Sequence, residues 1–181
     1  MVTQLPKKQK SRISLCRTVL YGTLMAEDDI DPENGPALLG WQESVSLPEL
    51  GAGPIIAKID TGARSAALHA DDIHISGHGK RRKVRFKVQR RGSSSRRIEC
   101  EMPLHDLRRV KSSNGQIELR PVIATPIEIG GHVVDAEITL TQRSDMGAAM
   151  LIGRSSIKGS FLVDPSRTFL RSRRPRKTKT R

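Results

Sequence analysis

Residues 55–63 read Ile-Ile-Ala-Lys-Ile-Asp-Thr-Gly-Ala (IIAKIDTGA), an apolar segment that runs directly into a short polar turn. The apolar run is typical of a buried strand, so we expect Asp60 at the end of that strand. Gly62 lets the backbone turn close to the carboxylate, and the Thr61 hydroxyl can hydrogen-bond neighbouring groups and stiffen the loop. Asp-Thr-Gly alone identifies no function, because Asp and Gly are the commonest turn residues.

Short strand-like segments surround this motif on both sides. Alternating or apolar runs occupy residues 55–59, 84–88, 98–102, 116–123, 127–129 and 133–140. Turn residues separate them, most clearly Asn114-Gly115 and Gly130-Gly131, which are typical of tight hairpins. The one candidate for a short helix is residues 154–158. The spacing predicts a mainly β domain, either a small barrel or a sandwich.

A second motif follows 90 residues after Asp60: Met150-Leu151-Ile152-Gly153-Arg154. Together with Asp-Thr-Gly-Ala it resembles the retropepsin-like aspartic peptidases. The resemblance implies that Asp60 is the catalytic residue and that Thr61, Gly62 and Ala63 form its active-site loop. It also implies that Leu151, Ile152 and Gly153 lie on a strand beside that loop, and that Arg154 ties the loop or a dimer together. For Arg64 a substrate-facing position and a surface salt bridge both stay open.

The resemblance extends over residues 40–170. Residues 126–133 (PIEIGGHV) resemble the hairpin that follows the flap in retroviral proteases, so the hairpin at residues 109–121 takes the flap's place, with Ser113, Asn114 and Gly115 at its tip. The stretches KIDTGARSAALHA and MLIGRSSIKGSFLVDPSRTFL are similar to the bacterial retropepsin-like family labelled ATP-dependent zinc protease, often encoded near RimK-type glutamate ligases. The implied fold is a small closed acid-protease barrel with one short C-terminal helix, which forms a two-fold dimer.

The mechanism of such peptidases needs two carboxylates that face one water molecule and share one proton. The chain has a single Asp-Thr-Gly, and Asp164-Pro165-Ser166 lacks the glycine turn. Two copies of Asp60 related by a two-fold axis supply both groups. We therefore expect a homodimeric aspartic endopeptidase, a hydrolase that cleaves peptides or proteins. The association with glutamate ligases and the positive charge favour glutamate-tailed or other acidic proteins as substrates.

The sequence gives little support for a metal or a nucleotide. It contains no His-Glu-x-x-His or Cys-x-x-Cys pattern and no Gly-x-x-x-x-Gly-Lys-Ser/Thr loop, so we expect no metal and no cofactor. A zinc-dependent peptidase that uses the segment from His69 to His78 stays as an alternative. On an extended segment, however, His69 and His74 point to opposite faces.

The formal net charge of +13 is distributed unevenly. Residues 171–181 hold seven basic residues and no acidic one, and residues 80–97 hold ten basic residues and no acidic one. The second run predicts a hairpin with one cationic face, which is either a charged surface or a weak polyanion-binding face. A second hypothesis is therefore a non-catalytic module that binds acidic protein tails or RNA, although aromatic residues for base stacking make up only 3% of the chain.

The 181 residues divide into a flexible leader (1–38, a candidate targeting segment), the peptidase domain (39–170) and a disordered basic tail (171–181). No apolar run approaches the length of a membrane-spanning helix. Cys16 and Cys100 cannot build a disulfide framework, so we expect free thiols and a cytoplasmic protein. The alternative is export, if residues 1–26 act as a signal.

Overall fold

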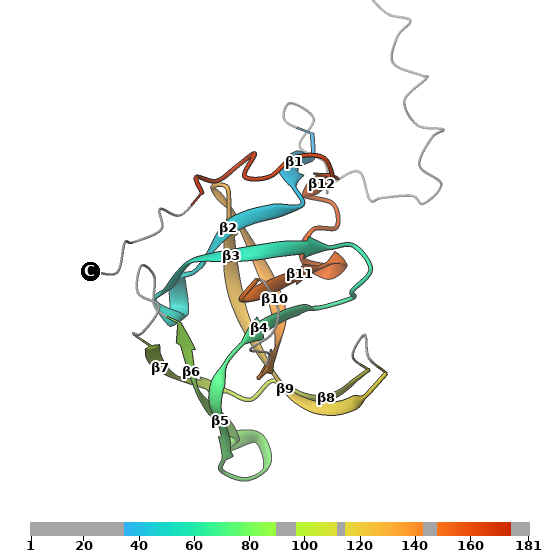
Figure 1. Ribbon diagram of the computed structural model, residues 1–181. Helices are drawn as coiled ribbons and strands as arrows, with labels where there is room; N and C mark the ends of the chain where they lie inside the picture. The colour runs from blue at the N-terminus through green and yellow to red at the C-terminus, as the bar shows by residue number, and fades with distance from the viewer. Residues whose placement is uncertain (1–34, 90–96, 112–114, 143–147, 175–181) are drawn as a thin grey trace, which may run out of the picture.

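The computed structural model describes residues 35–89, 97–111, 115–142 and 148–174, and Figure 1 shows that they form an almost entirely β structure. The mainly β fold predicted from the sequence is confirmed. Twelve strands follow one another in the described residues: β1 Ala37–Gly40, β2 Gln42–Leu47, β3 Ala52–Asp60, β4 Ala66–His69, β5 Asp71–Ser76, β6 Lys83–Gln89, β7 Arg97–Pro103, β8 Asp106–Lys111, β9 Ile117–Ile129, β10 His132–Thr141, β11 Met150–Gly153 and β12 Phe161–Asp164.

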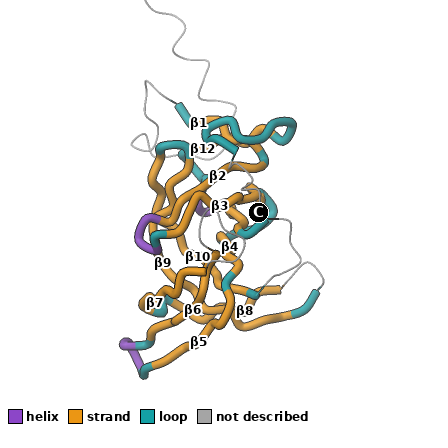
Figure 2. Tube along the Cα trace, turned by 60° about the vertical axis from the view of Figure 1, so that its left-hand side comes forward, coloured by secondary structure: helices purple, strands orange, loops and turns teal. Residues whose placement is uncertain are grey.

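Seven of these strands form the central sheet. Their order is β10-β4-β11-β3-β2-β9-β8, and β9 also pairs with β10, so the series of pairings returns to the strand on which it began. A three-stranded sheet, β5-β6-β7, lies at one end of the molecule, and the parallel pair β1 and β12 lies at the other (Figures 1 and 2).

The core is aliphatic, as the scarcity of aromatic residues requires. Its largest fully buried apolar side chains are Phe86, Leu39, Leu47, Leu68, Ile123, Ile127, Ile129, Ile138, Leu140, Met150 and Ile152. On β6, Val84, Phe86 and Val88 are buried while the alternate positions Lys83 and Arg85 are exposed. The alternation expected for this strand is therefore confirmed.

The long strand β9 differs from the prediction. The sequence suggested a break between residues 123 and 127, but β9 continues through it. The strand pairs with β8 up to Val122 and with β10 from Val122 onward. Thr125 is buried in the middle and its hydroxyl donates to Glu49 at 3.1 Å, so a polar residue interrupts the apolar pattern without ending the strand. The predicted tight turn at Gly130-Gly131 is confirmed, with φ of +57° and +88°.

The short C-terminal helix predicted at residues 154–158 is present as a 3-10 helix and is shorter than expected. It spans Arg154–Ser156. The backbone N–H groups of Arg154 and Ser155 donate to Ala63 and Arg64 at 3.0 Å, so the start of the turn is bonded to another loop. Gly159 follows with φ of +83°, a left-handed conformation that ends a helix.

The chain after β12 runs alongside β2 (Figure 1), and we call residues 165–174 the C-terminal strap. Glu43 on β2 is fully buried. Its carboxylate accepts hydrogen bonds from Gly40 N–H at 2.8 Å, from Leu170 N–H at 2.9 Å and from the Ser172 hydroxyl at 2.5 Å. Ser172 Oγ in turn accepts the N–H of Ser44 at 2.7 Å. Ordered structure thus continues past residue 170, where the sequence placed the end of the domain.

Replacing Ser172 should destabilise the fold. Ser172→Ala removes the hydroxyl that donates to Glu43 and leaves part of a buried carboxylate without a partner, so we expect the free energy of unfolding to fall by about 1–3 kcal/mol. Urea unfolding at neutral pH measures this change. Ser155→Ala, at an exposed site, is the matched control and should change stability by less than about 0.5 kcal/mol. Equal effects in the two variants would contradict the role of Ser172.

Candidate functional site

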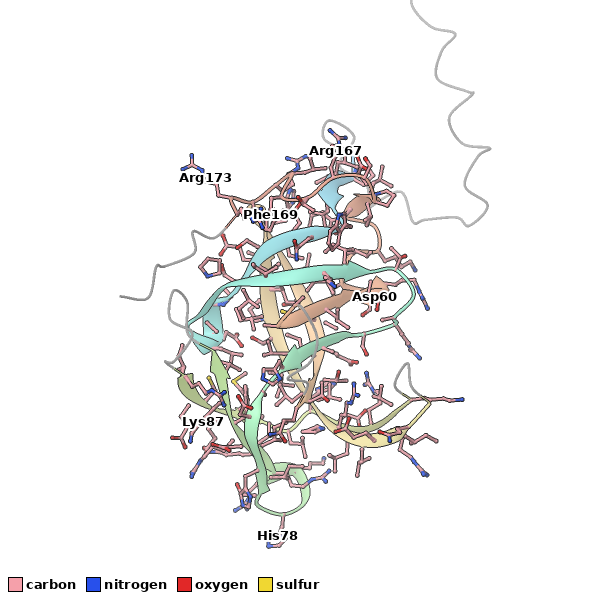
Figure 3. All side chains as sticks on the ribbon, in the orientation of Figure 1. Asp60, His78, Lys87, Arg167, Phe169 and Arg173 are labelled. Atoms are coloured by element: carbon pink, nitrogen blue, oxygen red, sulfur yellow. The ribbon has the colours of Figure 1, made fainter. Side chains whose placement is uncertain are left out.

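Asp60 is the last residue of β3, on the side of the molecule where the β8–β9 hairpin extends (Figures 1 and 3). Its Oδ1 accepts the backbone N–H of Gly62 at 3.0 Å and that of Ala63 at 3.1 Å. Among the residues that the structure describes, no group donates to Oδ2. One oxygen is therefore fixed by the turn, and the other is left for a molecule that enters the site.

β11 lies next to this turn because it pairs in parallel with β3, with Ile152 opposite Ile59 and Gly153 opposite Asp60. The backbone of Arg64 and Ser65 passes very close to Gly153: a Cβ at Gly153 would lie 2.5 Å from the carbonyl oxygen of Ser65. Glycine is therefore required here by space alone. The structure brings together the two motifs that the sequence singled out.

Arg154 holds the loop that follows β3. Its Nη1 donates to the carbonyl oxygens of Thr61 at 2.7 Å and Gly62 at 2.8 Å. Its backbone N–H donates to Ala63 at 3.0 Å. Because these bonds fix the carbonyl groups of the turn, the N–H groups that bind Asp60 Oδ1 stay aimed at the carboxylate. Arg154 is thus a positioning residue for the loop.

Asp60 lines a groove with a volume of about 740 Å³. The end of β3 and the loop that follows it line the groove, together with residues of β4, β8, β9, β10 and β11. The lining residues are Asp60, Gly62, Ala63, Arg64, Ser65, Ala67, Arg108, Arg109, Val110, Lys111, Arg120, Glu137, Thr139 and Leu151. A groove of this size and position can hold a peptide segment against the free oxygen of Asp60.

The hairpin in the flap's place is formed by β8 and the start of β9, which pair from Lys111 opposite Ile117. Ser113 and Asn114, predicted at its tip, lie outside the described residues, and Gly115 is exposed with φ of +84°. Ile117 and Leu119, on one face of β9, are 62% and 59% exposed. Exposed apolar side chains next to a groove are typical of a binding surface.

Glu137 is a second carboxylate in the groove that sequence reasoning missed. It accepts from Arg108 at 2.9 Å and contacts His105 Nε2 at 3.2 Å. The hydrogen bond from Arg108 holds the pKa of Glu137 below its ordinary value. A carboxylate committed to an arginine stays ionised, so Glu137 is a poor candidate for sharing a proton with Asp60.

Asp164, the other Asp considered in the sequence, has a structural place. Its carboxylate accepts from the Ser166 hydroxyl at 2.6 Å and from Arg167 at 2.5 Å, which lowers the pKa of Asp164 to about 2. These bonds shape the turn that begins the C-terminal strap. Asp164 is not among the groove residues.

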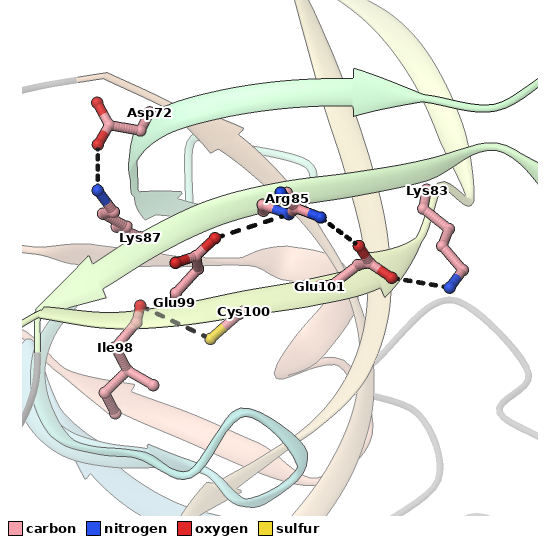
Figure 4. A network of polar contacts seen from close by, with 8 residues as sticks. All are labelled: Asp72, Lys83, Arg85, Lys87, Ile98, Glu99, Cys100 and Glu101. Atoms are coloured by element: carbon pink, nitrogen blue, oxygen red, sulfur yellow. Dashed lines mark hydrogen bonds and ion pairs between the residues drawn. The ribbon is translucent and has the colours of Figure 1, made fainter.

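The basic hairpin at β6 and β7 is less cationic than its sequence suggests. Carboxylates of β5 and β7 pair with its cations, and Figure 4 shows most of these contacts: Lys83 and Arg85 with Glu101, Arg85 with Glu99, Lys87 with Asp72, and Arg97 with Asp71. The bond from Lys87 lowers the pKa of Asp72, and that from Lys83 lowers the pKa of Glu101. Residues 90–96 of the basic run lie outside the described residues.

The histidine segment can be placed as well. His69 Nε2 lies 3.7 Å from Asp71, and His74 is exposed on β5. In the described part of the chain, no three His, Cys, Asp or Glu side chains gather as a metal site would need. Cys100 is a buried free thiol, whose pKa burial raises. None of the helices found in these segments is both long and apolar enough to pass through a membrane.

Comparison with known families supplies the assignment. The model of the RimB-like family, described as "Retropepsin-like aspartic endopeptidase RimB", matches residues 38–174. The chain belongs to this family. The resemblance inferred from the two motifs is confirmed, and the family match begins and ends within a few residues of the β1 strand and the C-terminal strap.

Relatives and a solved structure extend the comparison. The chain is 41% identical over 133 residues to a protein of Shewanella halifaxensis and 35% identical over 130 residues to one of Desulfotalea psychrophila, both named "Probable alpha-L-glutamate ligase". These matches cover 73% and 71% of this chain but only 29% and 28% of the relatives. A crystal structure of a Legionella pneumophila protein of unknown function is similar with a TM-score of 0.62 and 29% identity, over 75% of this chain and 98% of that one.

Proposed function

We propose that the protein is an aspartic endopeptidase in which two Asp60 carboxylates of a homodimer activate a water molecule for attack on a peptide bond. The observation that carries the proposal is the state of Asp60, which lines the groove. Its Oδ1 is fixed by two backbone N–H groups, and its Oδ2 has no hydrogen-bond donor among the described residues. Membership of a family described as aspartic endopeptidases supports the same activity.

The chemistry requires two carboxylates in unlike protonation states. The ionised group takes a proton from the attacking water, and the protonated group stabilises the oxyanion that forms on the carbonyl. Two carboxylates in contact share one proton because both cannot be charged at such short range. Glu137 is paired with Arg108, and Asp164 is hydrogen-bonded within its own turn. Asp60 of a second copy is therefore the best source of the second carboxylate. We further propose that the central sheet, in which β9 also pairs with β10, forms a closed barrel. The side of this barrel that carries Asp60 would contact the same side of a second copy across a two-fold axis.

The substrate class follows from charge and from the relatives. The relatives are named as glutamate ligases, and the matched region is under a third of their length. A ligase and a peptidase that act on the same glutamate-extended protein would form opposing activities. We therefore propose glutamate-tailed or other acidic proteins as substrates. The test is hydrolysis of a glutamate-rich peptide by the wild-type chain, compared with Asp60→Asn under the same conditions.

The dimer is a separate expectation. Sedimentation equilibrium at micromolar concentration should give about twice the chain mass of 20.0 kDa. Peptide cleavage per chain should fall on dilution below the dimer dissociation constant, because each site needs both copies. A chain that stays monomeric and still cleaves peptides would contradict the shared site while leaving the family assignment intact.

A further inference from the structure

The C-terminal strap has a fixed place on the body of the protein. Besides the bonds to Glu43, Phe169 N–H donates to the carbonyl oxygen of Gln42 at 2.8 Å. Arg171 packs against the turn between β9 and β10, where a side chain at Gly130 would collide with it. The side chains that the strap presents to solvent are therefore carried by a backbone that is bonded to the domain.

Phe169 has an unusual backbone conformation for a bulky residue. Its φ is +54°, in the left-handed region that side chains of this size rarely adopt. Hydrogen bonds from Phe169 N–H and Leu170 N–H hold this conformation in place. The ring stays partly exposed, and the guanidinium carbon of Arg174 lies 5.9 Å from the ring centroid. An aromatic ring beside an arginine at the surface is a unit on which an unpaired base can stack.

Three arginines of the strap, Arg171, Arg173 and Arg174, are exposed. None of them has an ion pair or a side-chain hydrogen bond to any residue in the described segments. The carboxylates that bond to the strap are otherwise engaged, because Glu43 is buried and Asp164 is paired within its own turn. The sequence adds four basic residues and no acidic one after Arg174. Positive charge is thus left unmatched on the strap, unlike on the β6–β7 hairpin, where carboxylates neutralise the cations.

We infer that Phe169, Arg171, Arg173 and Arg174, here called the strap surface, bind single-stranded nucleic acid. Guanidinium groups bind phosphate oxygens through paired N–H donors, so the arginines would contact the backbone of the strand. An unpaired base would stack on Phe169, which gives the surface a preference for single strands. The inference does not depend on the proposed peptidase activity.

Other anionic partners fit the strap surface less well. The carboxylates of an acidic protein would be attracted to the arginines but make no use of a flat aromatic ring. An anionic membrane would take up exposed apolar side chains, and the exposed residues of the strap include no large apolar side chain. Figure 3 shows Phe169 and Arg173 at the upper left and Asp60 on the right, and no residue of the strap surface lines the groove. The nucleic acid would therefore bind apart from Asp60.

Fluorescence anisotropy with the full chain tests the strap surface. The probes are fluorescein-labelled ten-nucleotide uridine RNA and thymidine DNA, with a peptide of ten glutamates as the anion that has no bases. The charge variant is Arg173→Ala with Arg174→Ala, and the stacking variant is Phe169→Leu. The matched control, Lys80→Ala with Arg81→Ala, removes two adjacent exposed cations from the turn between β5 and β6. Thermal unfolding of the variants checks that the fold is kept.

The charge variant should bind the RNA about tenfold more weakly than the wild type at low salt. The slope of log affinity against log salt should become shallower by about 1.4, since each lost phosphate contact contributes about 0.7 for a single strand. Phe169→Leu should lose about fivefold with its salt slope unchanged, because it removes a stack and no charge. The control should lose less than twofold. The comparison of RNA with DNA shows whether the 2′-hydroxyl contributes, and tighter binding of either one supports the inference.

Three outcomes would overturn the inference. One is an equal loss of RNA affinity in the charge and control variants, which would mean that only net charge matters. Another is a Phe169→Leu chain that binds RNA and DNA as tightly as the wild type. The third is a glutamate peptide that loses as much affinity as the RNA in the charge variant, which would make the strap a site for acidic proteins. Each result is independent of cleavage, so failure of the peptidase proposal would leave the strap surface standing.

Discussion

Asp60→Asn should leave a folded dimer that hydrolyses no peptide. The asparagine Oδ1 can still accept the N–H groups of Gly62 and Ala63, so the loop should keep its shape. The change removes the carboxylate that takes the proton of water, and we expect the rate of hydrolysis to fall by roughly 10²–10⁴-fold or below detection. Stability should be unchanged or slightly higher, because two carboxylates no longer meet in the dimer.

The measurement compares wild type and Asp60→Asn on glutamate-rich and apolar peptides from pH 4 to pH 8, with and without a chelator. Asp135→Asn, at an exposed site of β10 outside the groove lining, makes the same chemical change and should keep full activity. A chelator should have no effect, because the proposed mechanism uses no metal. Cleavage that survives Asp60→Asn, or that a chelator removes, would favour a metal-dependent peptidase instead.

The loop and its neighbouring strand could be predicted because both motifs consist of residue types that their geometry demands. Asp60 must end a strand and accept two N–H groups from the turn, and Gly153 must lie where a side chain has no room. Such requirements act over a few residues, so they are visible in a single sequence. Family resemblance then joined two short segments that lie far apart in the chain.

The walls of the groove could not be predicted in the same way. Arg120 faces Arg108, and Glu137 reaches Arg108 from β10, because of the register of β9 with its two neighbours. That register depends on the length of the hairpin loop and on a strand that passes through Pro126, where the sequence suggested a break. Sequence alternation indicates which residues face outward, but not which outward residues meet.

The partners of the basic run at residues 80–97 and of the C-terminal strap could not be predicted from the sequence either. The cationic run at residues 80–97 contains no acidic residue, and its partners Asp72, Glu99 and Glu101 come from neighbouring strands. Ser172 stands in a basic segment without an apolar pattern, yet it bonds to the buried carboxylate of Glu43. Pairings between distant segments decide both cases, and these pairings exist only in the folded chain.

Gly153→Ala should cause the largest loss of stability among the single changes considered. The new Cβ would lie 2.5 Å from the Ser65 carbonyl oxygen and 2.8 Å from that of Arg64, distances that backbone atoms cannot tolerate. Either β11 or the loop after Asp60 must move, which breaks the bonds from Arg154 N–H and Ser155 N–H to that loop. We expect the free energy of unfolding to fall by about 3 kcal/mol, as in overpacked interiors, and hydrolysis to be lost as Asp60 is displaced.

Gly62→Ala is the matched comparison, since it makes the same substitution on the other side of the site. Its Cβ would meet only Asp60 Oδ1, at 3.2 Å, and a carboxylate can shift by a few tenths of an ångström. We expect this variant to lose about 1 kcal/mol or less while it lowers activity, because a shift of Oδ1 moves the whole carboxylate, including the free Oδ2, more than it disturbs the fold. Urea unfolding and peptide hydrolysis measured on both variants separate the two effects. A Gly153→Ala chain as stable as the wild type would show that the loop and β11 do not pack as closely as the structure has them.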